Sequence, residues 1–475
     1  MGKVTGFLEF DRQEQKYQTA SDRIRHFKEF SVSPTEEDIV RQAARCMDCG
    51  IPYCHGDQGC PVNNQIPDWN DLVYAGDWRT ASRNLHSTNN FPEITGRICP
   101  APCEEACTLN LEDVPVSIKS IEKAIADRAF KEGWIKPEKA ARKTGRTVAI
   151  IGSGPAGMAA AQQLARAGHT VHVYEREAKA GGLLRYGIPD FKLEKASIDR
   201  RIKQMEAEGV TFHYNCDVGT TVCLLHLRDR HDATLICTGA ERPRDPHIPG
   251  MDLEGAHYAM PYLVQQNKRI GKEANEHAIP ILAGGKHVVV VGGGDTASDC
   301  IGTAFRQGAL SVTQMDIRPM PPLREDKMAF WPYWPTKFRT STSQAEGAER
   351  EFSAATLQVT GDATGRVTGI KCAKVNEKRE PLHGSTFHLL ADLVLIAIGF
   401  SGPLLGTYLE NSGLELDERT NIKADTLSYT TNIEGVFAAG DARKGQSLIV
   451  WAIREGRQAA CSIDLFLMGA TTLPR

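Results

Sequence analysis

The chain has 475 residues, and a typical domain has about 150, so the length implies about three domains and excludes a peptide hormone or a small binding module. Apolar residues make up 41% of the chain, charged residues 24%, and the net charge is −3, a balance without the basic excess that nucleic-acid binding requires. No apolar stretch approaches the ~18 residues of a membrane span, and residues 1–10 lack a secretory pattern. We therefore expect a cytoplasmic protein that binds neither nucleic acid nor membrane.

The first part of the chain carries helical patterns. Ser33 is predicted as an N-cap, because Pro34 follows it at the first helical position and Glu36 lies three residues after it. Amphipathic periodicity over 70–85 and 117–131 predicts further helices. Residues 133–146 are basic, contain a proline and have little apolar content, as expected of a linker. We predict a helical domain over 1–145 that ends in this basic linker.

Cysteines gather within this helical region. The chain has 13 cysteines, and seven of them lie between residues 46 and 107. An odd number without a secretory signal argues against a disulfide framework and favours metal or cluster ligation. The seven are Cys46, Cys49, Cys54, Cys60, Cys99, Cys103 and Cys107.

The spacing of these cysteines favours iron–sulfur clusters over zinc. Cys46 and Cys49 form a CxxC pair, but the later group is CxxxCxxxC rather than the second close pair of a zinc ribbon. Cys60 precedes Pro61, as in ferredoxins, where such a cysteine serves a different cluster from the preceding three. Two [4Fe–4S] clusters need eight ligands, so we expect an oxygen of Asp, Glu or Gln to complete the set. Zinc and buried structural thiols are the alternatives.

A first dinucleotide-binding pattern begins at residue 147. The β-branched run 147–151 leads into a GxGxxG turn, a helical stretch over 158–167 and a second strand over 169–174. These glycines permit a tight turn and close approach of the backbone to a pyrophosphate at the helix N-terminus. Glu175 is predicted to accept hydrogen bonds from an adenosine ribose. The turn supplies the candidate residues Gly152, Gly154, Pro155, Ala156 and Gly157.

The pattern recurs as GxGxxA after the strand 287–291, with a helix to residue 307 and a strand over 311–317. Two units in one chain imply two dinucleotides. The second strand ends with Asp316 and then Arg318, so a ribose hydroxyl of NADH or the 2′-phosphate of NADPH could bind here. We favour NADPH, and a surface arginine is the alternative. The candidate residues are Gly292, Gly294, Asp295, Thr296, Ala297 and Arg318.

The last part of the chain adds an acid at a strand end. The strand within 435–440 ends in Gly440 and Asp441, and a helical run over 446–460 follows, with Ser447 near its start. Asp441 beside a helix N-terminus suits a flavin. Two further strands, 233–239 and 391–399, are interpreted as crossings between domains, and Gly399 ends the second.

These motifs together resemble the small (β) subunit of glutamate synthase. The cysteine run, the turns at 149–157 and 292–297, the segment 181–189, the pair 440–441 and the aromatic segment 331–335 carry the resemblance, which covers essentially the whole chain. It implies a flavoprotein that takes hydride from NADPH or NADH onto FAD. It also implies electron transfer through two [4Fe–4S] clusters to a large (α) glutamate-forming subunit, within a hetero-oligomer.

The resemblance also assigns residues. It implies that Cys46, Cys49, Cys54 and Cys107 hold one cluster and that Cys60, Cys99 and Cys103 hold the other. The related domain of dihydropyrimidine dehydrogenase uses a side-chain amide as the eighth ligand, and matching its motif places Glu122 there. The alternative for Glu122 is a solvated helix face. The segment 181–189 resembles the flavin-contacting loop, with Gly182, Leu183, Arg185 and Tyr186 as contacts.

The expected fold is α/β, with two Rossmann-like domains of the glutathione-reductase type after a helical iron–sulfur domain. The predicted boundaries are 1–145 for the cluster domain, 146–248 and 390–475 for two parts of an FAD-binding domain, and 249–389 for the NAD(P)H-binding domain. No acid–base catalyst is assigned. An NAD(P)H:ferredoxin or electron-bifurcating oxidoreductase subunit is the alternative function, and a scaffold protein without activity is a weaker one. A thioredoxin-reductase-like enzyme would need a later CxxC, and none follows Cys49.

Overall fold

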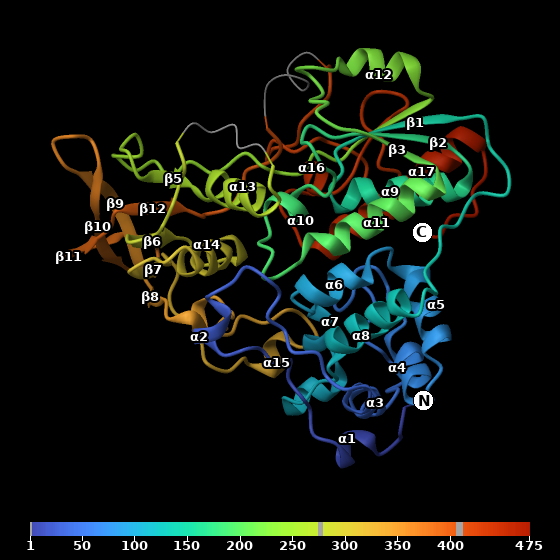
Figure 1. The fold of residues 1–475 in the computed structure, drawn as a ribbon, viewed down its shortest axis with the longest axis horizontal. Helices are drawn as coiled ribbons and strands as arrows, with labels where there is room; N and C mark the ends of the chain where they lie inside the picture. Colours follow the sequence, from blue (N-terminus) through green and yellow to red (C-terminus); the bar gives the residue numbers. More distant parts are fainter. Residues whose placement is uncertain (1, 274–278, 405–411) are drawn as a thin grey trace.

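The computed structural model describes residues 2–273, 279–404 and 412–475, which form a helical part below two α/β parts (Figure 1). Two parallel five-stranded sheets and one antiparallel three-stranded sheet account for the named strands. This arrangement confirms the α/β fold with two Rossmann-like sheets. None of the helices in the described ranges combines the length and apolar character needed to cross a membrane.

The helical part packs around a core that includes Trp69, Ile94 and Ile121, each fully buried. The predicted helix over 117–131 is confirmed as α8, whereas the stretch 70–85 belongs to two helices that separate near Gly76. The helices are α1 (Gly6–Glu9), α2 (Ala20–Arg23), α3 (Glu36–Ala44), α4 (Ile66–Tyr74), α5 (Trp78–Thr88), α6 (Pro92–Ile98), α7 (Pro102–Glu105), the 3₁₀ helix η1 (Thr108–Glu112) and α8 (Ile118–Lys131).

The start of α3 differs from the prediction. Thr35, not Ser33, is the N-cap: its hydroxyl accepts the backbone N–H of Asp38, and the Asp38 carboxylate accepts the backbone N–H of Thr35. This reciprocal pair satisfies two of the free N–H groups at the helix start. The helix therefore begins at Glu36, and the prediction of Ser33 as the cap is wrong.

The first sheet has the order β13–β4–β1–β2–β3, and all of its strands are parallel. Helix α9 follows β1 directly and packs side by side with the C-terminal helix α17 (Figure 1). The strands are β1 (Thr147–Ile151), β2 (Thr170–Tyr174), β3 (Val210–His213), β4 (Ala233–Ile236) and β13 (Val436–Ala438). The helices are α9 (Pro155–Ala167), α10 (Leu183–Tyr186), α11 (Lys195–Glu208), α12 (Leu224–Arg230), α16 (Asp441–Lys444) and α17 (Ile449–Met468).

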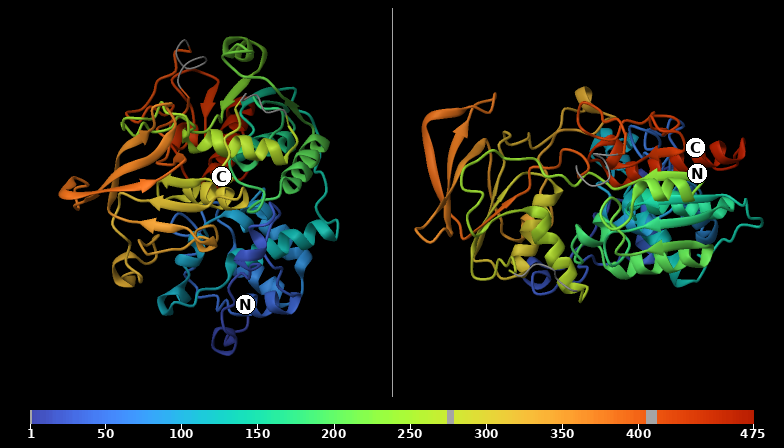
Figure 2. Two further views of the ribbon diagram at one scale, coloured as in Figure 1. Left: turned by 60° about the vertical axis from the view of Figure 1, so that its left-hand side comes forward. Right: turned by 90° about the horizontal axis from the view of Figure 1, so that it is seen from above.

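The second sheet has the order β5–β12–β6–β7–β8 and is also parallel. The antiparallel sheet β11–β10–β9 shares an apolar core with it and projects at the end opposite the C-terminus (Figure 2). The strands are β5 (Ala256–Tyr258), β6 (His287–Val291), β7 (Ser311–Met315), β8 (Glu349–Glu351), β9 (Ala354–Gly361), β10 (Val367–Val375), β11 (Pro381–Leu390) and β12 (Leu393–Ile396). The helices are α13 (Ala259–Ile270), α14 (Asp295–Arg306), α15 (Lys327–Phe330) and the 3₁₀ helix η2 (Gln344–Glu346).

The strands interpreted as crossings between domains are central members of the two sheets. β4 lies between β13 and β1, and β12 lies between β5 and β6. Because β12 pairs within the second sheet, the chain leaves that sheet after Ile396, beyond the boundary expected at residue 390.

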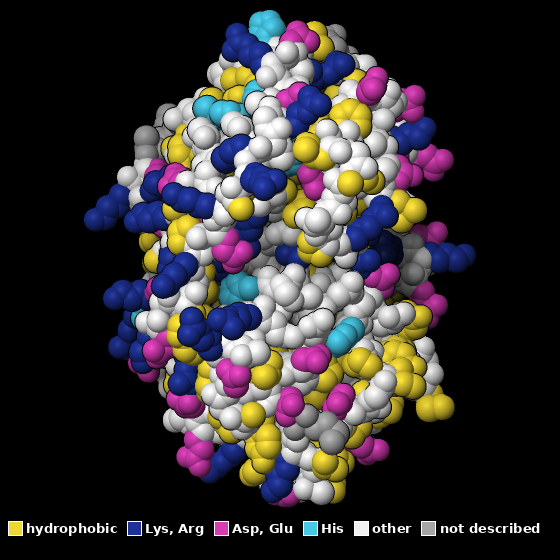
Figure 3. Space-filling view, turned by 90° about the vertical axis from the view of Figure 1, so that its right-hand side faces the viewer, with side chains coloured by type: hydrophobic (Ala, Val, Ile, Leu, Met, Phe, Trp, Pro, Cys, Tyr) yellow, Lys and Arg dark blue, Asp and Glu magenta, His cyan; other side chains and the backbone are white. Residues whose placement is uncertain are grey.

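The surface on the side of the C-terminus mixes both signs of charge. Figure 3 shows Lys and Arg side chains interspersed with Asp and Glu over the α/β parts, and hydrophobic side chains gathered lower down on the helical part. A mixed surface of this kind lacks the single-sign field that attracts a polyanion.

Candidate functional site

The first glycine turn joins β1 to α9 by close backbone contact. Gly152 has a φ of +97°, and a Cβ on it would lie 2.5 Å from the carbonyl oxygen of Cys237. A Cβ on Gly157 would lie 2.0 Å from the carbonyl oxygen of Gly152, so only glycine fits there. Gly154 is the N-cap of α9, whose free N–H groups therefore open at this turn. The turn has the form of an anion-binding helix start.

Glu175 ends β2 beside this turn and is 5% exposed. Its carboxylate accepts the backbone N–H groups of Ser153 at 3.1 Å and Glu177 at 2.9 Å, and the Ser153 hydroxyl as well. Burial raises the pKa of the Glu175 carboxyl above its ordinary value, while the hydrogen bond from Ser153 opposes that shift. The side chain is thus fixed as an acceptor at the strand end.

A large cavity of about 820 Å³ opens between the two α/β parts, and both glycine-turn units reach it. Its size is within the range of ligand pockets, roughly 300–1,000 Å³. The predicted cofactor residues that line it are Gly152, Gly154, Pro155, Ala156, Glu175, Gly182, Leu183, Tyr186, Asp295, Thr296, Gly399, Asp441 and Ser447.

Asp441 reaches the same cavity from the start of α16. Its Oδ1 accepts the Ser447 hydroxyl at 2.6 Å, and burial raises the pKa of its carboxyl to about 6. The preceding Gly440 has a φ of +71°, and a Cβ there would lie 2.8 Å from that of Ala156. The strand end of β13 is thereby held against the first turn of α9.

Seven of the predicted cofactor residues do not line the cavity. Arg185 is turned away: its Nε donates to the carbonyl oxygen of Ala180 at 2.6 Å, and its guanidinium pairs with Asp199. The neighbouring Tyr186 does line the cavity, and its hydroxyl donates to Glu273 at 2.9 Å. The others are glycine-turn or strand-end residues, namely Gly157, Gly292, Gly294, Ala297, Arg318 and Gly440.

The second glycine turn lies under an acid–arginine pair. A Cβ on Gly293 would lie 1.8 Å from Oδ2 of Asp316 and 2.5 Å from Nη2 of Arg318. Arg318 donates to Asp316 from Nε at 3.0 Å and from Nη2 at 2.8 Å, and these contacts raise the pKa of its guanidinium. Its side chain is 57% exposed, so the cation remains accessible beside the turn. The structure thus places Arg318 beside the second turn, and its binding of a 2′-phosphate stays a prediction.

The first set of cysteines lies under a segment from the second α/β part. Burial raises the pKa of the Cys54 thiol, and the charges of Cys107, Cys46 and Cys49 add to the shift. The indole of Trp331 donates to the carbonyl oxygen of Cys107 at 3.3 Å.

The same segment touches the helical part in two further places. The ring of Trp331 lies 4.9 Å from that of Tyr53, and Lys327 pairs with Asp113 at 3.0 Å. Among the seven clustered cysteines Cys49 alone is exposed.

The second set surrounds a small cavity. Its lining includes Cys60, Cys99, Cys103 and Glu122, together with Lys119 and Val450. Burial raises the pKa of Cys99 to about 12 and that of Glu122 to about 7. Three thiols and one carboxylate around one cavity form a four-ligand donor set, so the second predicted group of ligands is brought together.

The cysteines are not arranged around single ions. Within residues 2–273, 279–404 and 412–475, no three His, Cys, Asp or Glu side chains converge as ligands of one metal ion. A zinc ion requires its sulfur ligands at ~2.3 Å from one point. The thiolates of a [4Fe–4S] cluster, in contrast, each bind a different iron atom.

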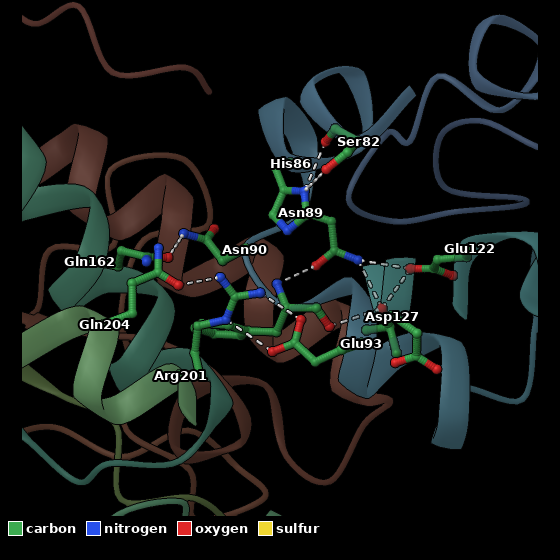
Figure 4. A network of polar contacts seen from close by, with 12 residues as sticks. Ser82, His86, Asn89, Asn90, Glu93, Glu122, Asp127, Gln162, Arg201 and Gln204 are labelled. Atoms are coloured by element: carbon green, nitrogen blue, oxygen red, sulfur yellow. Dashed lines mark hydrogen bonds and ion pairs between the residues drawn. The ribbon is translucent and has the colours of Figure 1, made fainter. Parts of the chain in front are cut away.

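Sequence reasoning missed two kinds of residue. Lys119 lines the second cysteine cavity, and its position three residues before Glu122 on α8 was the available signal. Asn89 and Thr95 donate hydrogen bonds to Glu122, and no motif marks them. A buried polar network continues from there to the first α/β part, where Glu93 pairs with Arg201 (Figure 4).

Comparison with known protein families covers both parts of the chain. Residues 146–456 match the pyridine nucleotide-disulphide oxidoreductase family, and residues 23–134 match the dihydropyrimidine dehydrogenase domain II, 4Fe-4S cluster family. Among solved structures, FprA of Mycobacterium tuberculosis in complex with NADPH has a TM-score of 0.53 at 20% identity, over 68% of this chain and 85% of FprA. That likeness concerns the fold.

Curated relatives match over the full chain. The glutamate synthase [NADPH] small chain of M. tuberculosis is 48% identical over 100% of this chain and 98% of its own length, and that of Bacillus subtilis is 46% identical over 100% of both. Glutamate synthase [NADH] of Schizosaccharomyces pombe is 45% identical over 100% of this chain but only 23% of its own length. The chain belongs to the glutamate synthase small-chain family.

Proposed function

We propose that this chain oxidises NADPH at a bound FAD and passes the electrons through two [4Fe–4S] clusters to a large glutamate synthase chain. That partner makes L-glutamate from L-glutamine and 2-oxoglutarate, and the two chains form a cytoplasmic hetero-oligomer. The names of the bacterial relatives, which specify NADPH, support NADPH as the coenzyme. The yeast relative is much longer than this chain, which supports a large partner that in yeast belongs to the same polypeptide.

One observation carries the proposal. The first turn of α17 separates the large cavity from the second cysteine cavity: Ile449 and Ala452 line the large cavity, and Val450 lines the cysteine cavity. A dinucleotide-sized cavity and a thiol-lined cavity therefore share one wall. This proximity suits electron transfer from the first to the second.

FAD, when bound, can accept a hydride and release electrons one at a time. The chain's part is to bind and orient. The N-terminus of α9 would hold the pyrophosphate, and Glu175 would accept hydrogen bonds from the ribose. Asp441 and its hydrogen-bond partner Ser447 line the cavity close to the first turn of α9 and would contact the ribityl chain or the flavin. The FAD residues are Gly152, Gly154, Pro155, Ala156, Gly157, Glu175, Gly182, Leu183, Tyr186, Gly440, Asp441 and Ser447, with Arg185 supporting the loop through Asp199.

NADPH binds at the second turn in this proposal. Arg318 is a planar cation held beside Gly293, a placement that suits bidentate binding of a 2′-phosphate. Asp295 and Thr296 start α14 at the rim of the shared cavity, so the coenzyme extends from Arg318 toward the flavin. The NADPH residues are Gly292, Gly294, Asp295, Thr296, Ala297 and Arg318, and Gly399 lies between the two ligands.

Both cysteine sets hold clusters in this proposal, as the donor chemistry suggests. Cys46, Cys49, Cys54 and Cys107 bind the first, and Cys60, Cys99, Cys103 and Glu122 bind the second. Because Cys49 is the exposed ligand, electrons leave to the partner from the first set.

The test uses the chain purified without air, with an absorption spectrum, iron and sulfide assays and titration with NADPH and NADH. About eight irons per chain and a flavin spectrum bleached by NADPH are expected. The large chain of the same organism is expected to bind, and glutamate formation then depends on both chains. Zinc without sulfide would end the cluster assignment, and binding of a ferredoxin in place of the large chain would favour an NAD(P)H:ferredoxin oxidoreductase.

A further inference from the structure

Glu122 is held on one of its two carboxylate oxygens. Oε1 accepts Nδ2 of Asn89 at 3.0 Å and the hydroxyl of Thr95 at 2.6 Å. Within the described ranges Oε2 has no hydrogen-bond partner, and Glu122 lines the cavity of Cys60, Cys99 and Cys103. One oxygen is therefore anchored to protein, and the other is available to the cavity.

Further contacts orient the amide of Asn89 toward Glu122 and leave the hydroxyl of Thr95 close to it. Oδ1 of Asn89 accepts the backbone N–H of Phe91 at 3.0 Å, so its NH₂ group must face Glu122. The two hydrogens of that NH₂ group go to Oε1 of Glu122 and to Oγ1 of Thr95, which lies 2.8 Å away. The single hydroxyl hydrogen of Thr95 has two acceptors within reach, Oε1 of Glu122 at 2.6 Å and the carbonyl oxygen of Phe91 at 3.2 Å, and the contact with Glu122 is the shorter. Asn89 and Thr95 are 0% and 1% exposed, so water does not replace these contacts.

We propose that Asn89 and Thr95 are positioning residues that make this site accept a carboxylate, and reject an amide, as the fourth ligand of the second cluster. This inference rests on the proposed function, in which Glu122 is a cluster ligand, and it names the residues that select a carboxylate at this position. Two converging donors require an oxygen acceptor at the position of Oε1. A carboxylate meets that requirement and still offers a second oxygen to iron.

A glutamine at position 122 fails in either orientation. With its carbonyl oxygen in the place of Oε1, it would present NH₂ to iron, and an amide nitrogen has no lone pair for a metal. With its NH₂ in that place, it would meet the N–H donor of Asn89 and leave buried donors unpaired. Hydrogen bonds of this kind around a metal ligand orient it and tune the metal.

The neighbouring asparagine provides a matched control. Asn90 is also buried, but Figure 4 shows it directed away from Glu122, and its Nδ2 donates to Gln162 at 2.7 Å. Its Oδ1 accepts from Arg457 at 2.6 Å. A change from asparagine to aspartate at 90 therefore adds the same charge one residue away without facing position 122.

The experiment compares Glu122→Gln with two double variants in the full chain purified without air. Iron per chain and the paramagnetic spectrum of the reduced protein are measured. Glu122→Gln is expected to lose the second cluster's signal, with iron below the about eight atoms of two cubanes. Adding Asn89→Asp provides an acceptor for the glutamine NH₂ and is expected to restore both, whereas adding Asn90→Asp is not. Retention of the signal in Glu122→Gln, or absence of restoration by Asn89→Asp, would overturn the inference.

Thr95 provides a second, milder test that does not alter charge. Thr95→Val removes the donor at nearly constant volume and is expected to shift the midpoint potential of the second cluster to a more negative value, while Thr95→Ser keeps the wild-type potential. Equal potentials in both variants would contradict the role of Thr95. Glu122→Leu tests whether Glu122 is a ligand at all, independently of Asn89 and Thr95. An unchanged second cluster in this variant would remove Glu122 from the proposed ligand set.

Discussion

The two glycine turns have the same strand–turn–helix order but differ in the charged side chains that lie beside them. In the first unit Glu175 is buried and accepts hydrogen bonds from Ser153 and Glu177. In the second unit Asp316 is paired with Arg318, whose side chain is 57% exposed. A buried carboxylate such as that of Glu175 suits the ribose hydroxyls of a ligand that stays bound. An exposed guanidinium such as that of Arg318 suits the phosphate of a ligand that binds and dissociates. The same local geometry would therefore serve, in the proposed function, a fixed cofactor in one unit and an exchanging coenzyme in the other.

The largest expected effect concerns the third position of each turn. Gly157→Ala would place a Cβ 2.0 Å from the Gly152 carbonyl oxygen, so α9 must move away from β1 and we expect the variant to lose FAD. Ala297→Gly, the opposite change in the second unit, is expected to cost about 1 kcal/mol of helix stability and to keep NADPH oxidation. Flavin absorbance per chain measures the first effect, and urea unfolding with an NADPH oxidation assay measures the second. Normal flavin content in Gly157→Ala would contradict the tight packing of the first turn.

The stability of the flavin-free protein is expected to depend on pH through Asp441, an acid that lines the cavity near the first unit. Asp441 has a pKa of about 6 in the folded chain against 3.8 ordinarily, so between these values the folded state binds the proton more tightly. The contribution of this group to the free energy of unfolding of flavin-free protein is therefore largest below pH 4. It falls by up to about 3 kcal/mol as the pH rises through 6.

Urea unfolding of flavin-free wild type and Asp441→Asn at pH 5 and 7.5 measures this contribution. The variant is expected to gain stability relative to wild type at the higher pH. An equal difference at both pH values would show that Asp441 does not titrate in this window.

Removal of the accessible cation tests the second unit. Arg318→Ala is expected to lower kcat/KM for NADPH by roughly 10- to 100-fold, because a charged hydrogen bond contributes about 1.5–3 kcal/mol. NADH, which lacks the 2′-phosphate, is expected to change little. Steady-state oxidation of both coenzymes with an artificial acceptor measures the ratio, and equal losses for the two would refute phosphate binding by Arg318.

The smallest expected effect concerns the partner of that cation. Asp316→Asn removes a negative charge near the phosphate and an acceptor for a ribose hydroxyl, so the preference for NADPH over NADH is expected to rise. The side chain of Asp316 is 12% exposed, but that of its partner Arg318 is 57% exposed, so the pair is worth at most about 1 kcal/mol and we expect an increase of no more than about 5-fold. A fall in the preference would mean that Asp316 acts mainly by orienting Arg318.

Local patterns predicted the parts of this chain whose conformation depends on near neighbours. The strand, glycine turn and helix from Thr147 to Ala167 follow from residues within that segment, and the structure contains them. The cap of α3 was misplaced by two residues, because Ser33 and Thr35 both fit a capping pattern and only the contact with Asp38 decides.

Long-range contacts account for what the sequence did not predict. The position of β12 depends on pairing with β5 and β6, which lie more than a hundred residues earlier. Arg185 was expected at the flavin, but Asp199 on another helix attracts its guanidinium. Asn89, at the end of α5, and Thr95, on α6, approach Glu122 only through the packing of these helices against α8, so no spacing in the sequence marks them.

The contact of Trp331 with Tyr53 and Cys107 has a mechanical consequence. It joins the part of the chain that carries Arg318 to the loop that carries the first cysteine set, and Lys327 adds an ion pair to Asp113 beside it. Any rotation of that α/β part as a rigid body must either carry the cysteine loop along or break this contact. A movement of that α/β part would therefore act directly on Tyr53, Cys107 and Asp113 in the helical part.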